Sequence, residues 1–493
     1  MKNIRIVGFD ETIGIADESI FANIADNLDK NGNSHIYSGI ASNGDSTDIS
    51  LSIEGTLRAN SSMHEVAYNS INERFTAITL ICPENLKYFK TSCSEYGNFS
   101  LNLCWIMYLS NSIYMHRVVK ISKGLDINLK GAPVAEFTSV APAKFYALMP
   151  SDFTRVTPKL LVKPEDKVKA GDPLFFDKEN PELQFVSPVS GKVVAVNRGE
   201  RRRVLSVVVE SDGKFESVEY KAQDVLSLSA DEIKANLLKA GLFGFIRQRP
   251  YDVIAEPKDT PRAIYVSAFD SKPLAVNFEI ALKGNEDDFQ TGLDALSRIA
   301  PVHLGICACQ KSTALLVAKN VTTTIFKGPH PAGNVGVQIN KTAPVNKGEI
   351  VWTIGAEEVI FIGRLFNKGK VDFTRTVALA GSEVKNPSYS KVVLGAQLTN
   401  ILAGRLEDKY ENRIIDGNVL TGKKTTADGF LGAFSTEVTV IPEIMNDADI
   451  LGWAMPRFGM YSTSRSYFSW LAPKRQYTID DRIKGGERHM IMS

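Results

Sequence analysis

The sequence is poor in the residue patterns that bind redox centres. Its 493 residues include five cysteines, and neither a CxxC pair nor a CxxCxxCxxxCP run is among them. Proteins bind iron–sulfur clusters through such runs, so we expect no cluster here. Few and scattered cysteines also favour a reduced, cytoplasmic setting. Cys307 and Cys309 alternate, and with no further Cys nearby they are typical of small core residues rather than metal ligands.

A long hydrophobic run is missing as well. The longest mainly apolar stretch, residues 99–114, spans 16 residues and is interrupted by serines and asparagines, whereas a transmembrane helix needs about 20. The first ten residues hold an apolar stretch that is too brief for the core of a signal peptide. We therefore expect no transmembrane segment, and a role at a membrane would have to come through partner proteins.

Strong charge of either sign is absent too. The formal net charge is +1, although residues 1–114 hold seven Lys and Arg against thirteen Asp and Glu, so the remainder is mildly basic. Nucleic-acid binding proteins cluster Lys and Arg on one face, and the sharpest cluster here is Arg201, Arg202 and Arg203. Such a short cluster is typical of a solvated hairpin tip, so nucleic acid is not an expected partner.

The chain is long enough for several domains, because one hydrophobic core rarely serves more than about 250 residues. Residues 1–114 are rich in Asn and Ser, whereas residues 115–133 resemble an authentic protein start. We treat residues 1–114 as an N-terminal extension of unknown fold. It is either an appended domain or an upstream reading frame joined in error, and the second interpretation is favoured.

Residues 115–222 are expected to form a biotinyl/lipoyl-like barrel-sandwich domain. Two matched segments, 159–176 and 185–210, each place short apolar strands around a glycine turn. Together they resemble the flattened barrel of biotinyl and lipoyl carrier domains. Those domains present a modified lysine on the hairpin between the two halves. Lys178 lies near that place, although farther from Ser187 than the carrier pattern predicts.

Residues 223–373 are expected to form a Rossmann-like α/β domain. Their pattern predicts a helix over 229–249, a strand over 263–268, a helix over 278–299 and a strand over 301–308. Strand, helix and strand at these lengths indicate a parallel sheet.

Residues 374–445 are expected to form a β-grasp, SLBB-like domain. Two strand-like runs lead to a helix from Gln397, and Asp416-Gly417 is a hairpin turn signal. Residues 446–493 remain as a truncated C-terminal segment. The predicted fold class is therefore α/β multidomain: a barrel-sandwich domain, a Rossmann-like domain and a β-grasp domain, preceded by the extension.

The segment AGLFGFIRQRPYD, residues 240–252, carries the most information about function. It resembles the place where the flavoprotein subunit of respiratory complex I, and the C subunit of the Rnf complex, have a glycine-rich loop around the flavin phosphate. Only Gly241 and Gly244 persist, and larger side chains such as Phe245 stand where the other glycines would be. No GxGxxG follows a predicted strand either. We therefore expect the chain to bind no flavin of its own.

Several motifs follow one another in a characteristic order, namely KISKGLDI, GLFGFIRQRP, KGPHPAGNVG, ALAGSEVKNP, GNVLTG and LGWAMPRF. Together they resemble the A subunit of the sodium-translocating NADH:quinone reductase, and the resemblance covers residues 115–493. The extension has no counterpart in that family, whose members also continue past this C-terminus through a further helical segment.

The resemblance implies a peripheral subunit on the cytoplasmic face of the bacterial inner membrane. The implied complex oxidises NADH, reduces ubiquinone or menaquinone and exports sodium, using flavins and iron–sulfur centres. The A subunit would pack chiefly on the membrane-embedded B subunit, with the other subunits up to F as further partners, and a quinone-binding role is proposed for it. The Ser/Thr-Gly-Ala-Thr run that attaches flavin in the B and C subunits does not occur here. The resemblance thus implies an enzyme at the level of the complex and no catalysis or cofactor in the isolated chain.

Three residues are candidates for contact with quinone or a partner, and no catalytic or metal-binding residue is predicted. His330 lies between two prolines, in a rigid loop that could present its imidazole to quinone carbonyls. Arg247 and Arg249 could bind carboxylates or phosphates, since guanidinium groups favour bidentate contacts. Salt bridges on the surface or within the chain are the alternative for these arginines.

Two other functions stay open from the residues alone. The chain could be a stand-alone flavin-dependent NADH dehydrogenase of the complex I flavoprotein type, or a lipoyl-like carrier protein modified at Lys178. Flavin absorbance separates the first from a cofactor-free subunit, and intact mass separates the second.

Overall fold

The computed structural model describes residues 116–443 without a break, and also residues 36–37, 51–52, 456, 458, 461, 468–471 and 475–479. The chain separates into two compact units, Met1–Tyr114 and Met115–Ser493. In the first unit, β1 (Ile36–Tyr37) pairs antiparallel with β2 (Leu51–Ser52). The rest of the extension and most of the C-terminal segment, including most of the motif LGWAMPRF, lie outside the described residues. Within the described part, no helix is long and apolar enough to cross a membrane.

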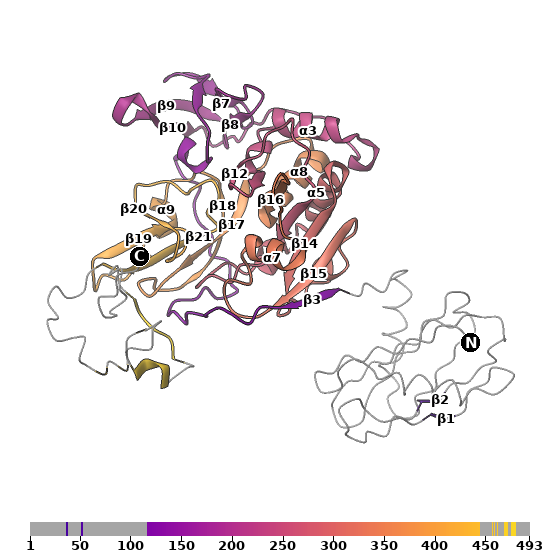
Figure 1. The fold of residues 1–493 in the computed structure, drawn as a ribbon. Helices are drawn as coiled ribbons and strands as arrows, with labels where there is room; N and C mark the ends of the chain where they lie inside the picture. The colour runs from indigo at the N-terminus through magenta and orange to yellow at the C-terminus, as the bar shows by residue number, and fades with distance from the viewer. Residues whose placement is uncertain are drawn as a thin grey trace, which may run out of the picture. The chain divides into compact units, whose positions relative to one another are not determined.

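Residues 145–211 form the two antiparallel sheets of the predicted barrel-sandwich (Figure 1). The predicted turn at residues 169–172 is present, with the Asp172 amide donating to the Lys169 carbonyl at 3.0 Å and Gly171 at a φ of +95°. The buried rings of Phe175 and Phe185, on neighbouring strands of one sheet, stack with their centroids 4.9 Å apart. One sheet has the order β4 (Phe145–Leu148), β10 (Val204–Ser211), β9 (Gly191–Arg198), β6 (Lys167–Val168), and the other β5 (Pro158–Leu160), β7 (Pro173–Asp177), β8 (Gln184–Val186).

Lys178 and the arginine cluster of the barrel lie at the surface positions predicted from the sequence. Lys178 follows β7 directly and is exposed. Arg201, Arg202 and Arg203 are exposed at the hairpin tip between β9 and β10. The arginine cluster is therefore a hairpin tip, as predicted.

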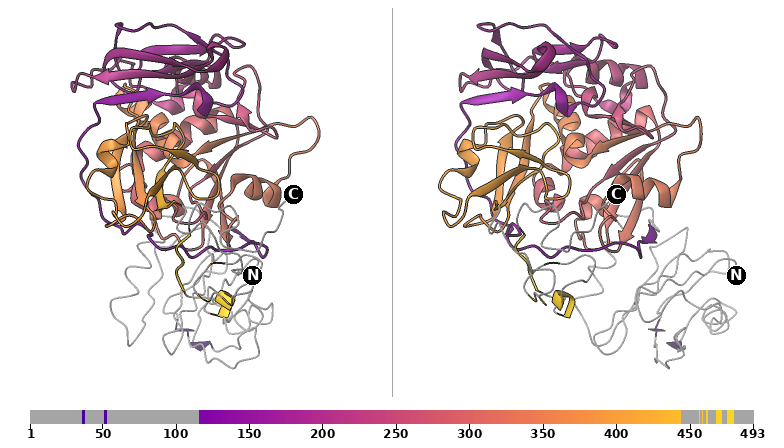
Figure 2. Two further views of the ribbon diagram at one scale, coloured as in Figure 1. Left: turned by 90° about the vertical axis from the view of Figure 1, so that its left-hand side faces the viewer. Right: turned by 60° about the vertical axis from the view of Figure 1, so that its left-hand side comes forward.

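A seven-stranded mixed sheet forms the centre of the α/β domain (Figure 2). Its strands lie in the order β12 (Val253–Ile254), β11 (Arg247–Arg249), β16 (Val351–Gly355), β13 (Ile264–Ser267), β14 (Val302–Cys307), β15 (Val321–Lys327) and β3 (Arg117–Lys120). The five strands from β16 to β3 run parallel, which confirms the predicted parallel sheet.

Strand β3 belongs to this sheet, although its residues were assigned to the barrel domain in the sequence. It pairs in parallel with β15, and Val119 and Ile121 pack with Phe326 and Ala332 in a small apolar cluster. Burial of these side chains holds the strand at the sheet edge, far along the chain from its partner.

The helix predicted over residues 229–249 is shorter than expected. Helix α3 (Ala230–Lys239) begins with a capping box between Ser229 and Glu232. It ends before Gly241, which takes a φ of +68°, a backbone conformation that stops helices. The prediction was therefore wrong beyond Lys239, and Arg247 and Arg249 lie on strand β11.

The helix predicted over residues 278–299 is divided in two. Helices α4 (Phe278–Leu282) and α5 (Glu286–Ile299) are separated at Gly284, where φ is +80°. Helix α5 packs closely on α8 (Ala356–Lys368), because Gly292 faces the backbone of Val359. The domain also contains α6 (Thr313–Leu316) and α7 (Val335–Thr342).

The β-grasp domain has a five-stranded sheet and one short helix, α9 (Thr399–Leu402). The predicted hairpin at Asp416-Gly417 joins β19 to β20, with Gly417 at a φ of +101°. The strand order is β18 (Ser388–Val393), β17 (Thr374–Ala380), β21 (Glu437–Pro442), β19 (Asn412–Asp416) and β20 (Lys423–Thr425).

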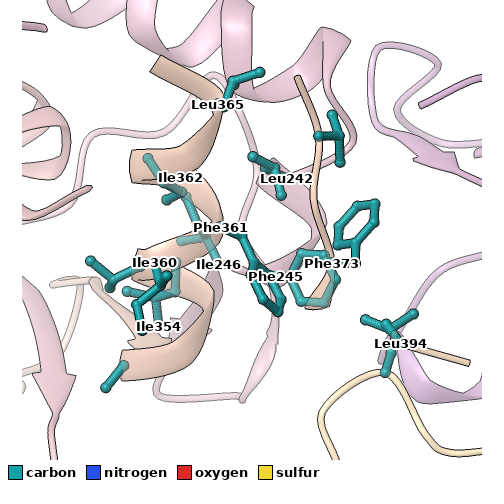
Figure 3. Close-up of a cluster of buried hydrophobic side chains, with 14 of the residues drawn as sticks. Leu242, Phe245, Ile246, Ile354, Ile360, Phe361, Ile362, Leu365, Phe373 and Leu394 are labelled. Atoms are coloured by element: carbon teal, nitrogen blue, oxygen red, sulfur yellow. The ribbon is translucent and has the colours of Figure 1, made fainter. Parts of the chain in front are cut away.

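The three domains share one apolar core. Phe245, just before β11, contacts the rings of Phe153 from the barrel, Phe361 from α8 and Phe434 from the β-grasp domain, at centroid distances of 6.0, 6.1 and 5.5 Å. Figure 3 shows Phe245 beside Phe361 and Phe373 in this cluster. Phe245 is therefore a packing residue at the junction of the domains.

The prediction of Cys307 and Cys309 as small core residues was wrong. Cys307 is half-buried, Cys309 is exposed, and the two form a disulfide. The alternating positions of the two cysteines were interpreted as positions on one strand. Strand β14 ends at Cys307, however, and the chain then turns so that the two side chains meet. The side-chain Oε1 atom of Gln310 stabilises this turn by accepting a hydrogen bond from the backbone amide of Cys307 at 2.8 Å.

Candidate functional site

A cavity of about 590 Å³ lies at the carboxyl ends of β13 and β16. Its walls come from the loop after β13, the first turns of α7 and α8, strand β11, and Phe434 and Thr436 of the β-grasp domain. Binding sites of open α/β sheets usually form at this edge, because strand ends and helix N-termini meet there. The cavity is therefore the main candidate site in the described part of the chain.

The apolar part of the cavity consists largely of aromatic rings. Phe245, Phe269, Phe278 and Phe434 all line it. The guanidinium carbon of Arg247 lies 4.3 Å from the ring centroid of Phe434, which is cation–π geometry. The lining can therefore hold a flat apolar group next to a cation.

Arg247 and Arg249, two of the residues singled out in the sequence, lie together on the cavity wall. Their guanidinium groups share one carboxylate: Arg247 Nη1 lies 3.2 Å from Asp252 Oδ2, and Arg249 Nη2 lies 3.3 Å from Asp252 Oδ1. The salt bridges of the alternative interpretation therefore exist. The Nε atom of each arginine is buried without a hydrogen-bond partner.

His330 is held beside the cavity rather than in its lining. Its Nδ1 atom lies 3.0 Å from Ser271 Oγ, its backbone amide donates to Asp126 Oδ1 at 2.9 Å, and the following peptide bond to Pro331 is cis. Residues 333–337, at the end of this loop and the start of α7, do line the cavity. The structure thus brings the two arginines and residues 333–337 together, and His330 is not among the lining residues.

An acidic pair at the start of α8 was not singled out in the sequence. Glu357 and Glu358 line the cavity, each with only 6% of its surface exposed. Both face Arg375 of β17, whose side chain is fully buried: Glu358 accepts a hydrogen bond from Nη2, and Glu357 Oε2 lies 3.5 Å from Nε. Acidic residues directly after the strand-like run VWTIG were the signal that could have identified the pair.

Burial changes the acidity of Glu357. Desolvation raises the pKa of Glu357 to about 7; the Arg375 guanidinium opposes this change, and the Glu358 carboxylate adds to it. Glu357 is therefore easily protonated near neutral pH.

A second buried carboxyl lies behind the rim of the cavity. Desolvation raises the pKa of Glu437 on β21 to about 8, the nearby Asp270 adds to this change, and Lys272 opposes it. Asp270 and Lys272 line the cavity and form an ion pair at 2.6 Å. The junction between the α/β and β-grasp domains therefore contains two carboxyls with raised pKa values.

The two glycines that persist from the flavin-loop pattern have a packing role. A Cβ atom at Gly241 would lie 2.7 Å from Val186 Cγ1, and one at Gly244 would lie 2.7 Å from Phe185 Cε1. Both glycines thus allow strand β8 of the barrel to approach. Metal binding has no obvious site either, since no group of three His, Cys, Asp or Glu side chains suitable for a metal occurs among the described residues.

Three family models match successive parts of the chain. They are the NqrA N-terminal barrel-sandwich hybrid domain at residues 119–212, the NqrA second alpha/beta domain at 228–371 and the NQRA C-terminal domain, an SLBB model, at 376–427. Together with the three sheet systems, they define the class: a multidomain α/β protein with a barrel-sandwich, an α/β and an SLBB domain. The predicted fold class is confirmed.

Curated relatives agree along most of the chain. The A subunit of the Na(+)-translocating NADH-quinone reductase of Yersinia pestis bv. Antiqua (strain Angola) is 37% identical over 378 residues, which cover 76% of this chain and 84% of the relative. The protein of the same name from Neisseria meningitidis serogroup A / serotype 4A (strain DSM 15465 / Z2491) is 36% identical with the same coverage. This chain belongs to the family of A subunits of the Na(+)-translocating NADH-quinone reductase.

A solved structure, an NAD+-reducing [NiFe]-hydrogenase in the air-oxidized state, covers 65% of this chain and 72% of its own, with a TM-score of 0.33 and 11% identity. A likeness this weak carries no argument about fold or function.

Proposed function

We propose that this chain is the cytoplasm-facing subunit of a sodium-pumping NADH:quinone reductase, peripheral to the membrane and docked on the B subunit. Support for the complex comes from the 37% identity that extends over 84% of a relative with that name. In this proposal the chain has no flavin or iron–sulfur centre of its own. Electrons from NADH pass through partner subunits, and this chain supplies structure and a binding site.

The same proposal assigns a quinone head group to the cavity. Supporting features are the volume of about 590 Å³, the phenylalanine rings of the lining and the arginine side chains at one wall. A quinone ring is flat and apolar and has two carbonyl oxygens that accept hydrogen bonds. Arginine side chains at the cavity wall are suitable donors for such oxygens.

Replacement of both arginines tests the assignment. We expect Arg247→Ala with Arg249→Ala to weaken assembly with the membrane subunits, or quinone binding, by roughly 1 to 3 kcal/mol, since charged hydrogen bonds are removed. The measurements are co-purification with the membrane subunits and quinone reductase turnover. Arg155→Ala, which removes an exposed partner of Glu256, is the matched control.

Wild-type yield and turnover in the double variant would show that these arginines serve only the internal pairs with Asp252. His330→Ala is a separate arm of the experiment. An effect on quinone turnover without an effect on assembly would place His330 near the quinone rather than near a partner subunit.

A further inference from the structure

A turn at the end of strand β14 carries the disulfide between Cys307 and Cys309. The backbone amide of Gln310 donates to the Cys307 carbonyl at 3.0 Å and closes this turn over residues 307–310. Cys307 is half-buried, whereas Ala308 and Cys309 are exposed. The bond therefore lies at the surface of the α/β domain, where another molecule can reach it.

A disulfide between such close neighbours contributes little to stability. In the chain-entropy model a disulfide stabilises the fold by closing a loop of the unfolded chain, and the effect grows with the length of the loop. Here the two cysteines are separated by only two positions in the sequence. Exposed disulfides are generally the labile ones, and in reducing compartments disulfides are usually transient and redox-sensing. The pair therefore has the features of a reactive site rather than of a structural cross-link.

The surroundings of the two sulfur atoms suit thiol–disulfide exchange. Cys309 is the more exposed of the two residues, so its sulfur is the expected point of attack by an incoming thiolate. The backbone amide of Cys309 donates to Cys307 Sγ at 3.2 Å. A hydrogen bond in this position stabilises the thiolate that leaves Cys307 when the disulfide breaks.

The turn is also connected to the wall of the large cavity through one buried side chain. Gln310 accepts the hydrogen bond from the Cys307 amide through Oε1 and donates through Nε2 to the Ala268 carbonyl at 2.7 Å. Ala268 directly follows β13 and lines the cavity. Gln310 thus links the redox turn to the cavity wall.

A second connection runs from the turn to helix α4. The backbone amides of Lys311 and Ser312 donate to Glu279 Oε1 at 2.7 and 2.5 Å. Glu279 is next to Phe278, whose side chain lines the cavity. The chain that follows the disulfide is therefore held against two elements of the same cavity wall.

We propose that Cys307 and Cys309 form a thiol–disulfide exchange site for a small protein dithiol, and that reduction of the site loosens the adjoining cavity wall. A thiolate of the reductant attacks Cys309 Sγ and forms a mixed disulfide, while Cys307 Sγ leaves as a thiolate and takes up a proton. The second thiol of the reductant then attacks the mixed disulfide and releases Cys309 as a thiol. The chain gains two electrons and two protons, and the reductant becomes a disulfide.

Loosening of the wall follows from the position of the cysteines inside the turn. After reduction the sulfur atoms must move apart, because unbonded atoms cannot stay at bonding distance. Gln310 closes the same turn, so this movement weakens its hydrogen bond to Ala268. The inference does not depend on the occupant of the cavity, and a failure of the quinone assignment would leave it standing.

Mass spectrometry of the full chain tests the exchange. Trypsin cleaves after Arg298 and Lys311, so residues 299–311 form one peptide with these two cysteines and no other. After treatment with oxidised glutathione we expect this peptide to be lighter by two hydrogen atoms. After treatment of the folded chain with reduced thioredoxin we expect N-ethylmaleimide on both cysteines. Dithiothreitol on the denatured chain is the positive control. Free thiols under oxidised glutathione, or a bond that thioredoxin leaves intact in the folded chain, would overturn the exchange site.

Hydrogen exchange tests the link to the cavity. On reduction, the amides of Cys307 and Gln310 and the segment around Ala268 should exchange about 2- to 10-fold faster, as for one weakened hydrogen bond. Strand β8 of the barrel is the internal control and should not change. The variant with Cys307→Ser and Cys309→Ser should exchange at the faster rate with and without thioredoxin, and thermal unfolding checks that it folds. Unchanged exchange around Ala268 after full reduction would overturn the link.

Discussion

Replacement of Phe245 by Ala should strongly destabilise the chain, because this ring joins all three domains. Phe245 has 4% of its surface exposed and contacts four aromatic rings, those of Phe153, Phe361, Phe373 and Phe434, at centroid distances between 5.5 and 6.1 Å. Truncation of a buried Phe costs about 3 to 5 kcal/mol in lost burial and residual cavity. Aromatic pairs add about 0.5 to 1.5 kcal/mol each, which places Phe245→Ala near the upper end of the range.

The assay is thermal unfolding of the purified chain followed by circular dichroism. A loss of this size should lower Tm by roughly 10 °C or more, at about 2 to 4 °C for each kcal/mol in a domain of this size. Phe215→Ala is the control, since Phe215 is 41% exposed and its truncation should change stability by less than about 0.5 kcal/mol. A Tm for Phe245→Ala within about 2 °C of wild type would refute the view that this ring holds the domains together.

Three further outcomes are expected. The purified chain should be colourless, and stoichiometric flavin absorbance after gel filtration would contradict this, since Phe245 and its neighbours fill the place of the flavin loop. Deletion of residues 2–114 should leave the Tm of the remainder unchanged, because the chain divides between Tyr114 and Met115; a loss of several kcal/mol would show that the extension packs on it. Stability should fall as pH rises from about 4.5 to about 8, because the folded chain keeps a proton on Glu437 that the unfolded chain releases. In Glu437→Gln the difference in Tm between pH 5 and pH 8 should shrink, and an unchanged difference would exclude Glu437 as its source.

Sequence patterns predicted the features that depend on neighbouring residues. The parallel strands at 263–268 and 301–308, and the hairpin at Asp416-Gly417, follow from local β-rich runs and turn residues. The early end of α3 was missed because the apolar residues after Gly241 continue a helical pattern. Those side chains instead enter the core between the domains, where Phe245 is buried.

Features built from distant segments could not be predicted in this way. Strand β3 joins the α/β sheet by pairing with β15. The whole barrel domain lies between these two strands in the sequence. The candidate site was predicted in part: Arg247 and Arg249 were named, whereas Glu357 and Glu358 were not. Their partner Arg375 belongs to another domain, so the buried charge cluster exists only after the domains have packed.

Co-purification is the measurement that tests the central claim most directly. The chain would be tagged and expressed together with the membrane subunits of a sodium-translocating NADH:quinone reductase, and then purified in mild detergent. The account predicts one copy of the chain in a stable complex with those subunits, with sodium-dependent NADH:quinone reductase activity. Recovery of the tagged chain alone, from cells in which the other subunits form an active complex without it, would contradict the account.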